Sequence, residues 1–550
     1  MMHTWRMSLT AKDAVFGQYF ETSTTDARCM YNVANFYIRN TMTGIQKSPE
    51  ERTANETEVL HYVFTGIQAA NIRTKQTIDK TFREIDEAKG LKKHALLVKF
   101  SKKKFVFFEY PTASNWMLSY GALDAIFKAI CHPVYKKMVS HVAQNSIRKV
   151  SSAWKSYFES LQEYRKSPKK FSGKPQMPGY IKDQKATAWF SAATAILKNI
   201  KGKYYLAFAK YKKLFCIGPE SLYAGMKYIK TEIKPMYGTY YVMVTFDDKK
   251  ADIKVPSHPE RIIGIDPGLD NFAVVANNFG ETPFLIRGGA VKAENQWFNK
   301  ERTRLMSELT KGKDSTRSVK NSKRLSALSR KRDDFLRDFF YKAAHYICHF
   351  ASESKADVIV VGHNKNQKKD IDMGHQSNQA FVSVPFCRFF EILSMVGIKY
   401  GIPVVAQEES YTSKASLLDM DNIPVYKTGD ADEYKFSGCR VKRGLYRSAD
   451  GTEINADVNG AANILRKKYT YAFEGQEDLG YLYRTTKVVG YKDLYRNAVS
   501  IHKEHSKRSK TGLGHMCNKR YRGERKLILR QSFHKEKPDY RKLWKEKQAA

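Results

Sequence analysis

The segment RIIGIDPGLDN, residues 261–271, places a carboxylate at the end of a largely apolar strand. The run 262–265 leads to Asp266, and Pro267 and Gly268 follow at once. Proline has no backbone N–H to donate and glycine favours turns, so the strand should stop there. We therefore expect the Asp266 side chain to project beyond the edge of a sheet. A single aspartate before Pro-Gly is usually a turn residue, so its meaning depends on what accompanies it.

Two other acidic clusters stand at the ends of predicted elements. In PVVAQEESYTSKAS, Glu408 and Glu409 follow an apolar strand, and in INADVNGAANIL, Asp457 opens a helix in which Asn459 and Asn463 share one side. Each cluster has an ordinary explanation, because glutamates after a strand are usually solvated and an aspartate at a helix start is usually a cap. Their common setting favours a joint interpretation, in which carboxylates from three segments meet.

The whole chain is strongly basic. Its 550 residues contain 95 Lys plus Arg and 56 Asp plus Glu, which gives a net charge of +39. With 42% hydrophobic residues the chain can bury a core, so it is not a disordered basic tail. A folded protein with so large an excess of positive charge needs a polyanion to neutralise it, and nucleic acid is the usual polyanion. Neither a bilayer-spanning run nor a signal-peptide core is visible, so we expect a cytoplasmic, nucleoid-associated protein of a prokaryotic cell and no membrane partner.

A group of carboxylates that lie close together is unexpected in so basic a chain. They would raise one another's pKa unless a cation lay between them. Magnesium suits such a site, because it is a hard ion that takes oxygen ligands and keeps waters for a phosphate to replace. Two such ions about 4 Å apart can activate a water and stabilise the leaving oxygen of a phosphodiester. The sequence therefore predicts a nuclease site with two Mg²⁺ ions, whose catalytic residues are Asp266, Glu408 or Glu409, and Asp457.

The hydrophobic period changes along the chain and divides it into parts. Residues 10–165 have the three-to-four spacing of helices, and residues 180–247 have the period of two typical of short strands in a small barrel or sandwich. The Lys-rich stretch DDKKADIKVPSHPE resembles a linker. From Arg261 onward strands alternate with helices, which implies a mixed sheet flanked by helices. The predicted fold class is thus a multidomain α/β protein.

Five motifs together resemble a known family. IIGIDPG, ADVIVVGHNKNQKK, EESYTSKASLLD, FSGCRVKRGLYRS and INADVNGAANILRK, within residues 261–468, are similar to the RuvC-type nuclease domain of the TnpB family. These are RNA-guided endonucleases of insertion-sequence transposons, related to compact type V CRISPR effectors. The resemblance implies an RNase H-like fold, a guide RNA, a double-stranded DNA target with a short flanking motif, and magnesium chemistry at Asp266, a glutamate and Asp457.

The resemblance also suggests how the domains are arranged. In chain order we expect the first strand of a wedge barrel (1–12), a helical recognition lobe (13–170), the β-barrel wedge domain (171–255) and the first part of the nuclease domain (260–409). A target-binding insert (410–454), the third-motif helix (455–470) and a basic tail (471–550) should follow.

Two departures from the family pattern stand out. Most members have the second acid directly after the strand that here reads VIVVG, but this chain has Gly362 and His363 there. The glutamate would then come from EESYTSK, as in eukaryotic relatives of the family, whose register favours Glu409 and gives Asp266, Glu409 and Asp457 as metal ligands. Strand alternation instead puts Glu408 in phase with Val404 and Ala406. The sequence therefore leaves open whether Glu408 or Glu409 faces the metal.

The second departure concerns zinc. Typical members carry paired CxxC motifs in the insert, but this chain has Ser416 and Asp419 at comparable places and only Cys439 remains. The seven cysteines of the chain form no CxxC pair, and one thiolate cannot make a tetrahedral site, so we expect no structural zinc. Packing should hold the insert instead. The expected packing residues are Leu417, Leu418, Tyr426, Phe436 and Tyr446.

Basic side chains should contact the nucleic acid. Residues 301–337 carry twelve Lys plus Arg against five acids and should form a helix pair beside the site, although such charge is equally typical of a solvated helix face. The candidate contacts in this pair and in the insert are Arg324, Arg330, Lys331, Arg332, Lys442, Arg443 and Arg447.

Other functions share some of these features. A DDE-type transposase also uses three acids and magnesium but acts on transposon ends, and a non-catalytic RNA-binding protein explains the charge but not the acids. Sugar kinases and actin-like ATPases also open with a strand of this kind, but they supply Thr or Ser where this chain has Leu269, Asp270 and Asn271. Within the guided-nuclease interpretation, the guide can come from a transposon end or from a CRISPR array, because both uses share this catalytic domain.

Overall fold

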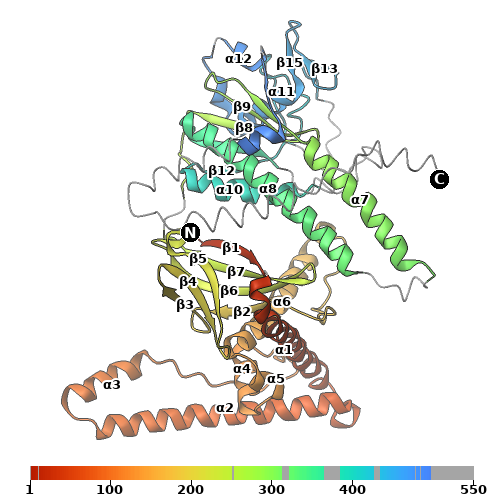
Figure 1. The fold of residues 1–550 in the computed structure, drawn as a ribbon. Helices are drawn as coiled ribbons and strands as arrows, with labels where there is room; N and C mark the ends of the chain where they lie inside the picture. Colours follow the sequence, from red (N-terminus) through yellow and green to blue (C-terminus); the bar gives the residue numbers. More distant parts are fainter. Residues whose placement is uncertain are drawn as a thin grey trace. The chain divides into compact units, whose positions relative to one another are not determined.

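The computed structural model describes residues 2–9, 11–249, 253–312, 321–363, 384–425, 434–476, 478–483 and 485–496. Two compact units, Met1–Ala251 and Asp252–Ala550, make up the chain (Figure 1). Each is described by itself below. Tyr426, Cys517 and the basic stretch after residue 496, which figured in the sequence predictions, lie outside the described residues.

The α-helices of unit 1 lie between residues 17 and 166, where the three-to-four apolar spacing predicts them. The two longest are α1 (Gly17–Gly44) and α2 (Ala54–Glu87), and α2 begins with a capping box between Thr53 and Glu56. Trp154 is fully buried and donates its indole N–H to Asn35 at 2.9 Å, which ties α6 to α1. The other helices are α3 (Gly90–Lys102), α4 (Tyr120–Ala129), α5 (Pro133–Lys137) and α6 (Ser140–Lys166), and the 3₁₀ turns are Ala11–Phe16, Pro49–Glu51, Pro168–Lys170 and Glu220–Tyr223.

Two antiparallel sheets complete unit 1. The first has the order β1-β7-β6-β2 and the second the order β3-β4-β5. Tyr237 and Gly238, both with positive φ, form the tight turn between β6 and β7. The strands are β1 (Met2–Ser8), β2 (Ala188–Ser191), β3 (Ala195–Ile200), β4 (Lys203–Phe208), β5 (Leu214–Pro219), β6 (Lys227–Met236) and β7 (Thr239–Asp247).

A six-stranded mixed sheet forms the centre of unit 2, in the order β12-β11-β8-β9-β10-β16. β11 and β12 run parallel to β8, whereas β9 is antiparallel to it. This arrangement confirms the predicted mixed α/β architecture. The strands are β8 (Ile262–Pro267), β9 (Asn271–Asn277), β10 (Phe284–Arg287), β11 (Val358–Gly362), β12 (Val404–Gln407) and β16 (Lys487–Val489).

Helices pack against both faces of this sheet. Ile263 and Ile265 of β8 belong to one core with α8 (Lys323–Glu353) and α10 (Phe386–Tyr400), and Ile262 belongs to another with α11 (Ala456–Lys468). Gly264 allows α11 to approach closely, because a Cβ there would lie 2.2 Å from the carbonyl oxygen of Ala461. The long charged stretch forms the expected helix pair, α7 (Gly289–Thr310) and α8.

The chain after α11 differs from the basic tail expected for residues 471–550. Its described part contains the 3₁₀ turn Thr470–Phe473, α12 (Gly480–Tyr483) and β16, which pairs in parallel with β10 at the edge of the sheet. Phe473, Leu482 and Leu494 are buried there. The surrounding Lys and Arg residues obscure these few apolar positions in the sequence. No helix among the described residues is both long and apolar enough to span a bilayer.

The insert folds around a small antiparallel sheet, β13 (Cys439–Lys442), β14 (Leu445–Arg447) and β15 (Glu453–Asn455). Leu417 and Tyr446 are buried as expected, and Leu418 and Phe436 are half-buried. Hydrogen bonds add to this packing, since the Asp421 carboxylate accepts from the backbone N–H groups of Ser416 at 2.7 Å and Ser437 at 3.1 Å.

Candidate active site

Asp266 stands at the carboxyl end of β8. It is still part of the ladder, paired with Val274 of β9, so it is not merely a turn residue. On the other side, Val361 of β11 pairs with Ile265, which puts Gly362 next to Asp266 along the sheet edge. Gly362 and His363 are the residues that the resemblance places where most TnpB members have their second acid.

The Glu409 carboxylate occupies the space that Gly362 leaves. A Cβ at residue 362 would lie 2.5 Å from Oε2 of Glu409 and 3.4 Å from Cδ of Pro267. Glu409 comes from the segment after β12, which pairs with β11 and ends at Gln407. The acid from the neighbouring strand therefore reaches over Gly362 toward the end of β8.

Glu408 faces a different partner. Its Oε2 lies 2.7 Å from Nζ of Lys467, a side chain only 3% exposed, and its Oε1 accepts from the N–H of Ser410 at 2.7 Å. Burial opposes ionisation of Glu408, but the hydrogen bonds from Lys467 and Ser410 outweigh it and lower the pKa. Lys467 also donates to the carbonyl oxygens of Ser410 and Pro424. Glu408 thus anchors the segment in which Glu409 lies.

The amides of α11 hold the same segment. Asn459 accepts from the N–H of Leu417 at 2.9 Å and donates to the carbonyl of Ala415 at 2.8 Å, and Asn463 donates to the carbonyls of Thr412 and Ala415. Both asparagines are completely buried. Their four-residue spacing, visible in the sequence, therefore fixes the loop after Glu409 to the helix.

Asp457 lies in the first turn of α11 but does not cap it. The side chain of Asn455 accepts from the N–H groups of Asp457 and Val458 and is the N-cap. The Asp457 carboxylate is therefore available for side chains: Asn271 donates to its Oδ2 at 2.7 Å, and Nη2 of Arg440 lies 3.4 Å from its Oδ1. The cap explanation of Asp457 is thereby excluded.

The other two acids act electrostatically on Asp266. Burial, the Glu409 charge and the Asp457 charge, in that order, raise the pKa of Asp266 well above its usual range, and only Arg440 opposes them. Gly460 of α11 is close as well, since a Cβ there would lie 2.8 Å from Oδ2 of Asp266. The carboxylates predicted from three remote segments therefore share one site.

This donor set suits a hard divalent cation. All three side chains offer carboxylate oxygens, the ligands that magnesium prefers, and their mutual repulsion is what a bound cation would relieve. In the part of the chain that the structure describes, no three His, Cys, Asp or Glu side chains form a ready-made metal cage. The residue types and their electrostatics therefore fit magnesium, whereas the side chains are not already arranged around an ion.

The predicted basic contacts fall into two groups. Arg324, Arg330 and Lys331 are exposed on α8, and Lys331 lies over the ring of Trp297, whereas Arg332 donates to Asn295 at 2.6 Å and joins α8 to α7. In the insert, Arg443 pairs with Asp270, Arg447 pairs with Glu453 at 2.7 Å, and Lys442 is exposed.

The sequence did not single out Arg440, Asn271 or Lys467 for these roles. Arg440 and Asn271 contact Asp457 from opposite directions in the chain, and Lys467 holds Glu408. Only the position of Asn271, five residues after Asp266, hinted that it lies near the site.

One family model matches the end of unit 1 and the first part of unit 2. Residues 242–368 match the OrfB_IS605 family model, described as a probable transposase. This match supports the resemblance to the TnpB family. No curated protein matches the chain.

Three solved structures are similar to most of the chain. The protein of a Cas12f1–sgRNA–target DNA complex has 12% identity and a TM-score of 0.42, over 85% of this chain and 99% of that one. A CRISPR-Cas12f ternary complex has 14% identity and a TM-score of 0.27, over 74% and 82% of the two chains. A Cas12i–crRNA–dsDNA complex has 10% identity and a TM-score of 0.26, over 68% and 55%.

Proposed function

We propose that this protein is a magnesium-dependent, RNA-guided DNA endonuclease with an RNase H-like catalytic domain. The observation that carries the proposal is that burial and the charges of Glu409 and Asp457, acids from two remote segments, raise the pKa of Asp266 at one sheet edge. The net charge of +39 supplies the polyanion-binding character such an enzyme needs. The guide RNA, the DNA target and the expected wedge barrel and recognition lobe rest on the resemblance of unit 2 to the TnpB family.

Asp266, Glu409 and Asp457 would hold the magnesium ions, with Glu409 rather than Glu408 as the second ligand. Bound ions of this kind supply an activated water and stabilise the leaving oxygen of a phosphodiester. Because Glu408 is occupied by Lys467, it serves to position its neighbour. In this proposal the two adjacent glutamates therefore have different tasks.

Arg440 has a second task in this proposal. It pairs with Asp457 over 3.4 Å and remains 45% exposed, so it can turn toward a phosphate once Asp457 binds a cation. Asn271 keeps the other oxygen of Asp457 in place. The two side chains therefore orient the third acid and present one positive charge to the substrate backbone.

The test begins with the RNA. Full-length protein purified from its host should carry a discrete structured RNA, and with that RNA and magnesium it should cut a plasmid containing the matching sequence. Asp457→Asn should keep RNA and DNA binding and lose cleavage, while Glu474→Gln, which changes an exposed acid of the same unit, should cut normally.

Each alternative function has a distinct outcome in this test. Binding of Asp457→Asn to RNA should be unchanged; its loss would mean that Asp457 is structural. Tight binding to transposon ends without RNA would identify a DDE-type transposase, and RNA binding without any magnesium-dependent cleavage would identify a non-catalytic RNA-binding protein.

A further inference from the structure

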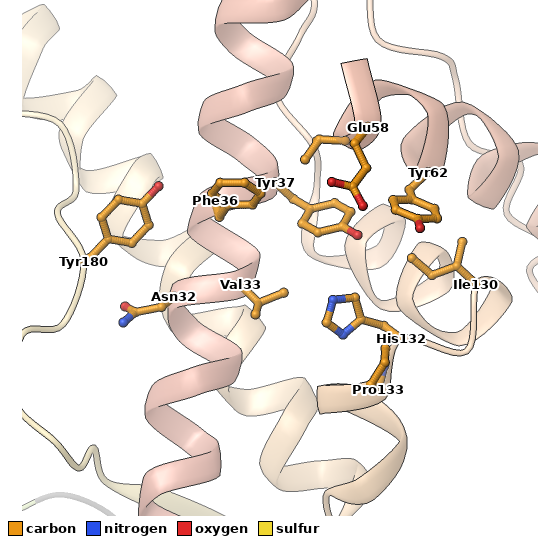
Figure 2. Close-up of a pocket in the computed structure, with 11 residues that line it drawn as sticks. Asn32, Val33, Phe36, Tyr37, Glu58, Tyr62, Ile130, His132, Pro133 and Tyr180 are labelled. Atoms are coloured by element: carbon orange, nitrogen blue, oxygen red, sulfur yellow. The ribbon is translucent and has the colours of Figure 1, made fainter. Parts of the chain in front are cut away.

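Unit 1 contains a pocket that the proposed cleavage chemistry does not use. Its volume is about 560 Å³, within the usual range of small-molecule sites. α1, α2, the turn between α4 and α5, and the segment around Tyr180 form its walls (Figure 2). The lining includes the aromatic rings of Phe36, Tyr37, Tyr62 and Tyr180.

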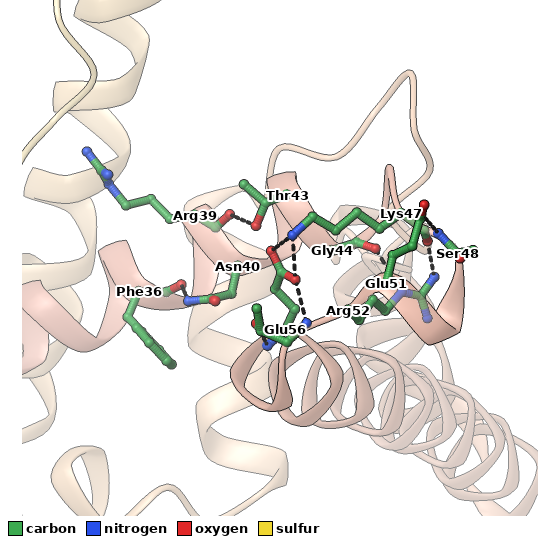
Figure 3. A network of polar contacts seen from close by, with 11 residues as sticks. Phe36, Arg39, Asn40, Thr43, Gly44, Lys47, Ser48, Glu51, Arg52 and Glu56 are labelled. Carbon is green, nitrogen blue, oxygen red and sulfur yellow. Dashed lines mark hydrogen bonds and ion pairs between the residues drawn. The ribbon is translucent and has the colours of Figure 1, made fainter.

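A polar network fixes the angle between the two helices that bear most of the lining (Figure 3). Nζ of Lys47 lies 2.9 Å from both carboxylate oxygens of Glu56, and the N–H of Thr53 donates to the same carboxylate at 2.9 Å. Arg52 donates to the carbonyl oxygens of Gly44 and Lys47. The α1–α2 corner is thus held on both sides, so α2 presents its pocket residues to α1 in one orientation.

Hydrogen bonds also fix the wall that carries Tyr180. Asn32 donates to the carbonyl of Ile181 at 3.1 Å and accepts from its N–H at 2.8 Å. Arg39 donates to the carbonyl of Pro178 at 2.7 Å, and its guanidinium lies 5.4 Å from the centre of the Tyr180 ring. The segment is therefore a built part of the pocket.

The pocket lining contains a negatively charged side chain but no Lys or Arg. Glu58 is the only charged side chain among the lining residues, and Figure 2 shows its carboxylate directed between Tyr37 and Tyr62. Burial lowers the pKa of His132, so its imidazole is neutral near pH 7. Burial and then the charges of Tyr62 and Glu58 raise the pKa of Tyr37 to about 12, so its hydroxyl stays protonated. With a carboxylate and no lysine or arginine in the lining, the pocket would repel a phosphate.

We propose that this pocket binds an unpaired guanine base of a single-stranded nucleic acid. Flat aromatic rings stack on bases, and the carboxylate of Glu58 accepts hydrogen bonds only. Guanine offers two adjacent donors, N1–H and N2–H, on its Watson–Crick edge, which match the two oxygens of one carboxylate. Adenine, cytosine and uracil each offer fewer donors there. In a chain with a net charge of +39, a nucleic acid is the partner that brings such a base.

The experiment measures binding of the full-length protein, without magnesium, to a labelled oligoadenylate and to the same strand with one central guanine. Raised salt suppresses binding that depends on phosphate contacts. We expect the guanine strand to bind about tenfold more tightly to the unmodified protein, as for other bidentate base contacts. RNA and DNA versions of both strands show from which nucleic acid the base comes. Because no cleavage is measured, the result is independent of the proposed nuclease activity.

Two variants separate hydrogen bonding from stacking. Glu58→Gln replaces one acceptor with a donor and should abolish the preference for guanine, whereas Glu84→Gln on the same helix should keep it. Tyr62→Ala should weaken binding of both strands about fivefold or more. Tyr483→Ala, whose ring is 37% exposed compared with 36% for Tyr62, should bind both strands as the unmodified protein does. Thermal unfolding of each variant checks that it is folded.

Three results would overturn the proposal. One is an unmodified protein that does not distinguish the two strands, and another is a guanine preference that survives in Glu58→Gln. The third is displacement of the guanine strand by choline, since an aromatic pocket with one carboxylate would then be a site for an organic cation.

Discussion

The α1–α2 corner of unit 1 and the sheet edge of unit 2 each hold an acidic side chain whose pKa is shifted, and the two shifts have opposite signs. Glu56 is 4% exposed, and hydrogen bonds from Thr43, Lys47 and Thr53 lower its pKa to about 2. Burial and two neighbouring carboxylates instead raise the pKa of Asp266. An acid whose donors all come from the protein contributes to stability, whereas one surrounded by like charges is prepared for a cation from outside.

The largest effect is expected for Asp266→Asn, which removes the unsatisfied charge. Cleavage should fall by about a thousandfold or more, because a metal ligand is lost. The free energy of unfolding without divalent ions should rise by about 1 kcal/mol, because the like charges of Glu409 and Asp457 then face a neutral amide. Cleavage rates and denaturant unfolding measure the two changes. A destabilised variant would show that Asp266 is structurally satisfied, as Glu56 is.

The adjacent glutamates sharpen the comparison within unit 2. Glu409→Gln should reduce cleavage by about a thousandfold, as expected for a metal ligand. Glu408→Gln should reduce it by only about tenfold, because it weakens the hold of Lys467 on the segment rather than the site itself. Single-turnover cleavage at saturating magnesium separates them. Equal losses would contradict the assignment of different tasks.

Gly362→Ala tests whether cleavage requires that residue 362, beside Asp266, has no side chain. The added Cβ would lie 2.5 Å from the Glu409 carboxylate and 2.7 Å from Cδ1 of Ile464, so the glutamate must move. We expect a loss of cleavage of roughly ten- to a hundredfold, with RNA binding retained. Gly289→Ala, at an open position of the same unit, is the matched control. Unchanged cleavage would mean that Glu409 does not act from this position.

Glu56→Gln tests how much the hydrogen-bonded carboxylate of Glu56 contributes to stability. Removing the charge that Lys47 and Thr53 bind should lower the free energy of unfolding by about 2 kcal/mol. Tryptophan fluorescence is a suitable probe, because four of the six tryptophans, Trp5, Trp116, Trp154 and Trp189, lie in unit 1. Glu84→Gln, with an exposed side chain on the same helix, should change stability very little. A neutral effect of Glu56→Gln would remove the contrast with Asp266.

The smallest effect is expected for the pH dependence of the stability that Glu56→Gln removes. Because folding lowers the pKa of Glu56 from 4.5 to about 2, its ionised form stabilises the protein fully above pH 4.5. The stabilisation is lost progressively as the pH falls from 4.5 through the folded pKa of about 2, and only below that pKa is the carboxylate protonated in both states. The difference in unfolding free energy between the unmodified protein and Glu56→Gln should therefore shrink between these values. A difference independent of pH would point to packing rather than charge.

The sequence correctly indicated several parts of the fold. Apolar spacing predicted the helices of unit 1 and its short strands, and the alternation of strands with helices predicted the mixed sheet flanked by helices. It missed β16, because three strand residues among many lysines and arginines leave no alternating pattern long enough to recognise. Pairing with β10 supplies the order that the local sequence does not.

The choice between Glu408 and Glu409 shows where pattern-based prediction ends. Alternation groups Glu408 with Val404, which packs on the side of α8 and α10. Glu408 instead contacts Lys467 of α11, because the strand ends at Gln407 and alternation no longer applies beyond it. Similarly, helix-start statistics suggested Asp457 as a cap, but Asn455 takes that place and leaves the carboxylate to other partners.

The sequence by itself determined the basic character of the chain and the ends of strands and helix at which its acids occur, because both follow from composition and local periodicity. The tertiary structure decided which acids meet, that Arg440 and Asn271 both contact Asp457, and that Gly362 makes room for Glu409. Those contacts join residues as many as 186 positions apart, as for Asn271 and Asp457, and no local pattern encodes the distance between such side chains.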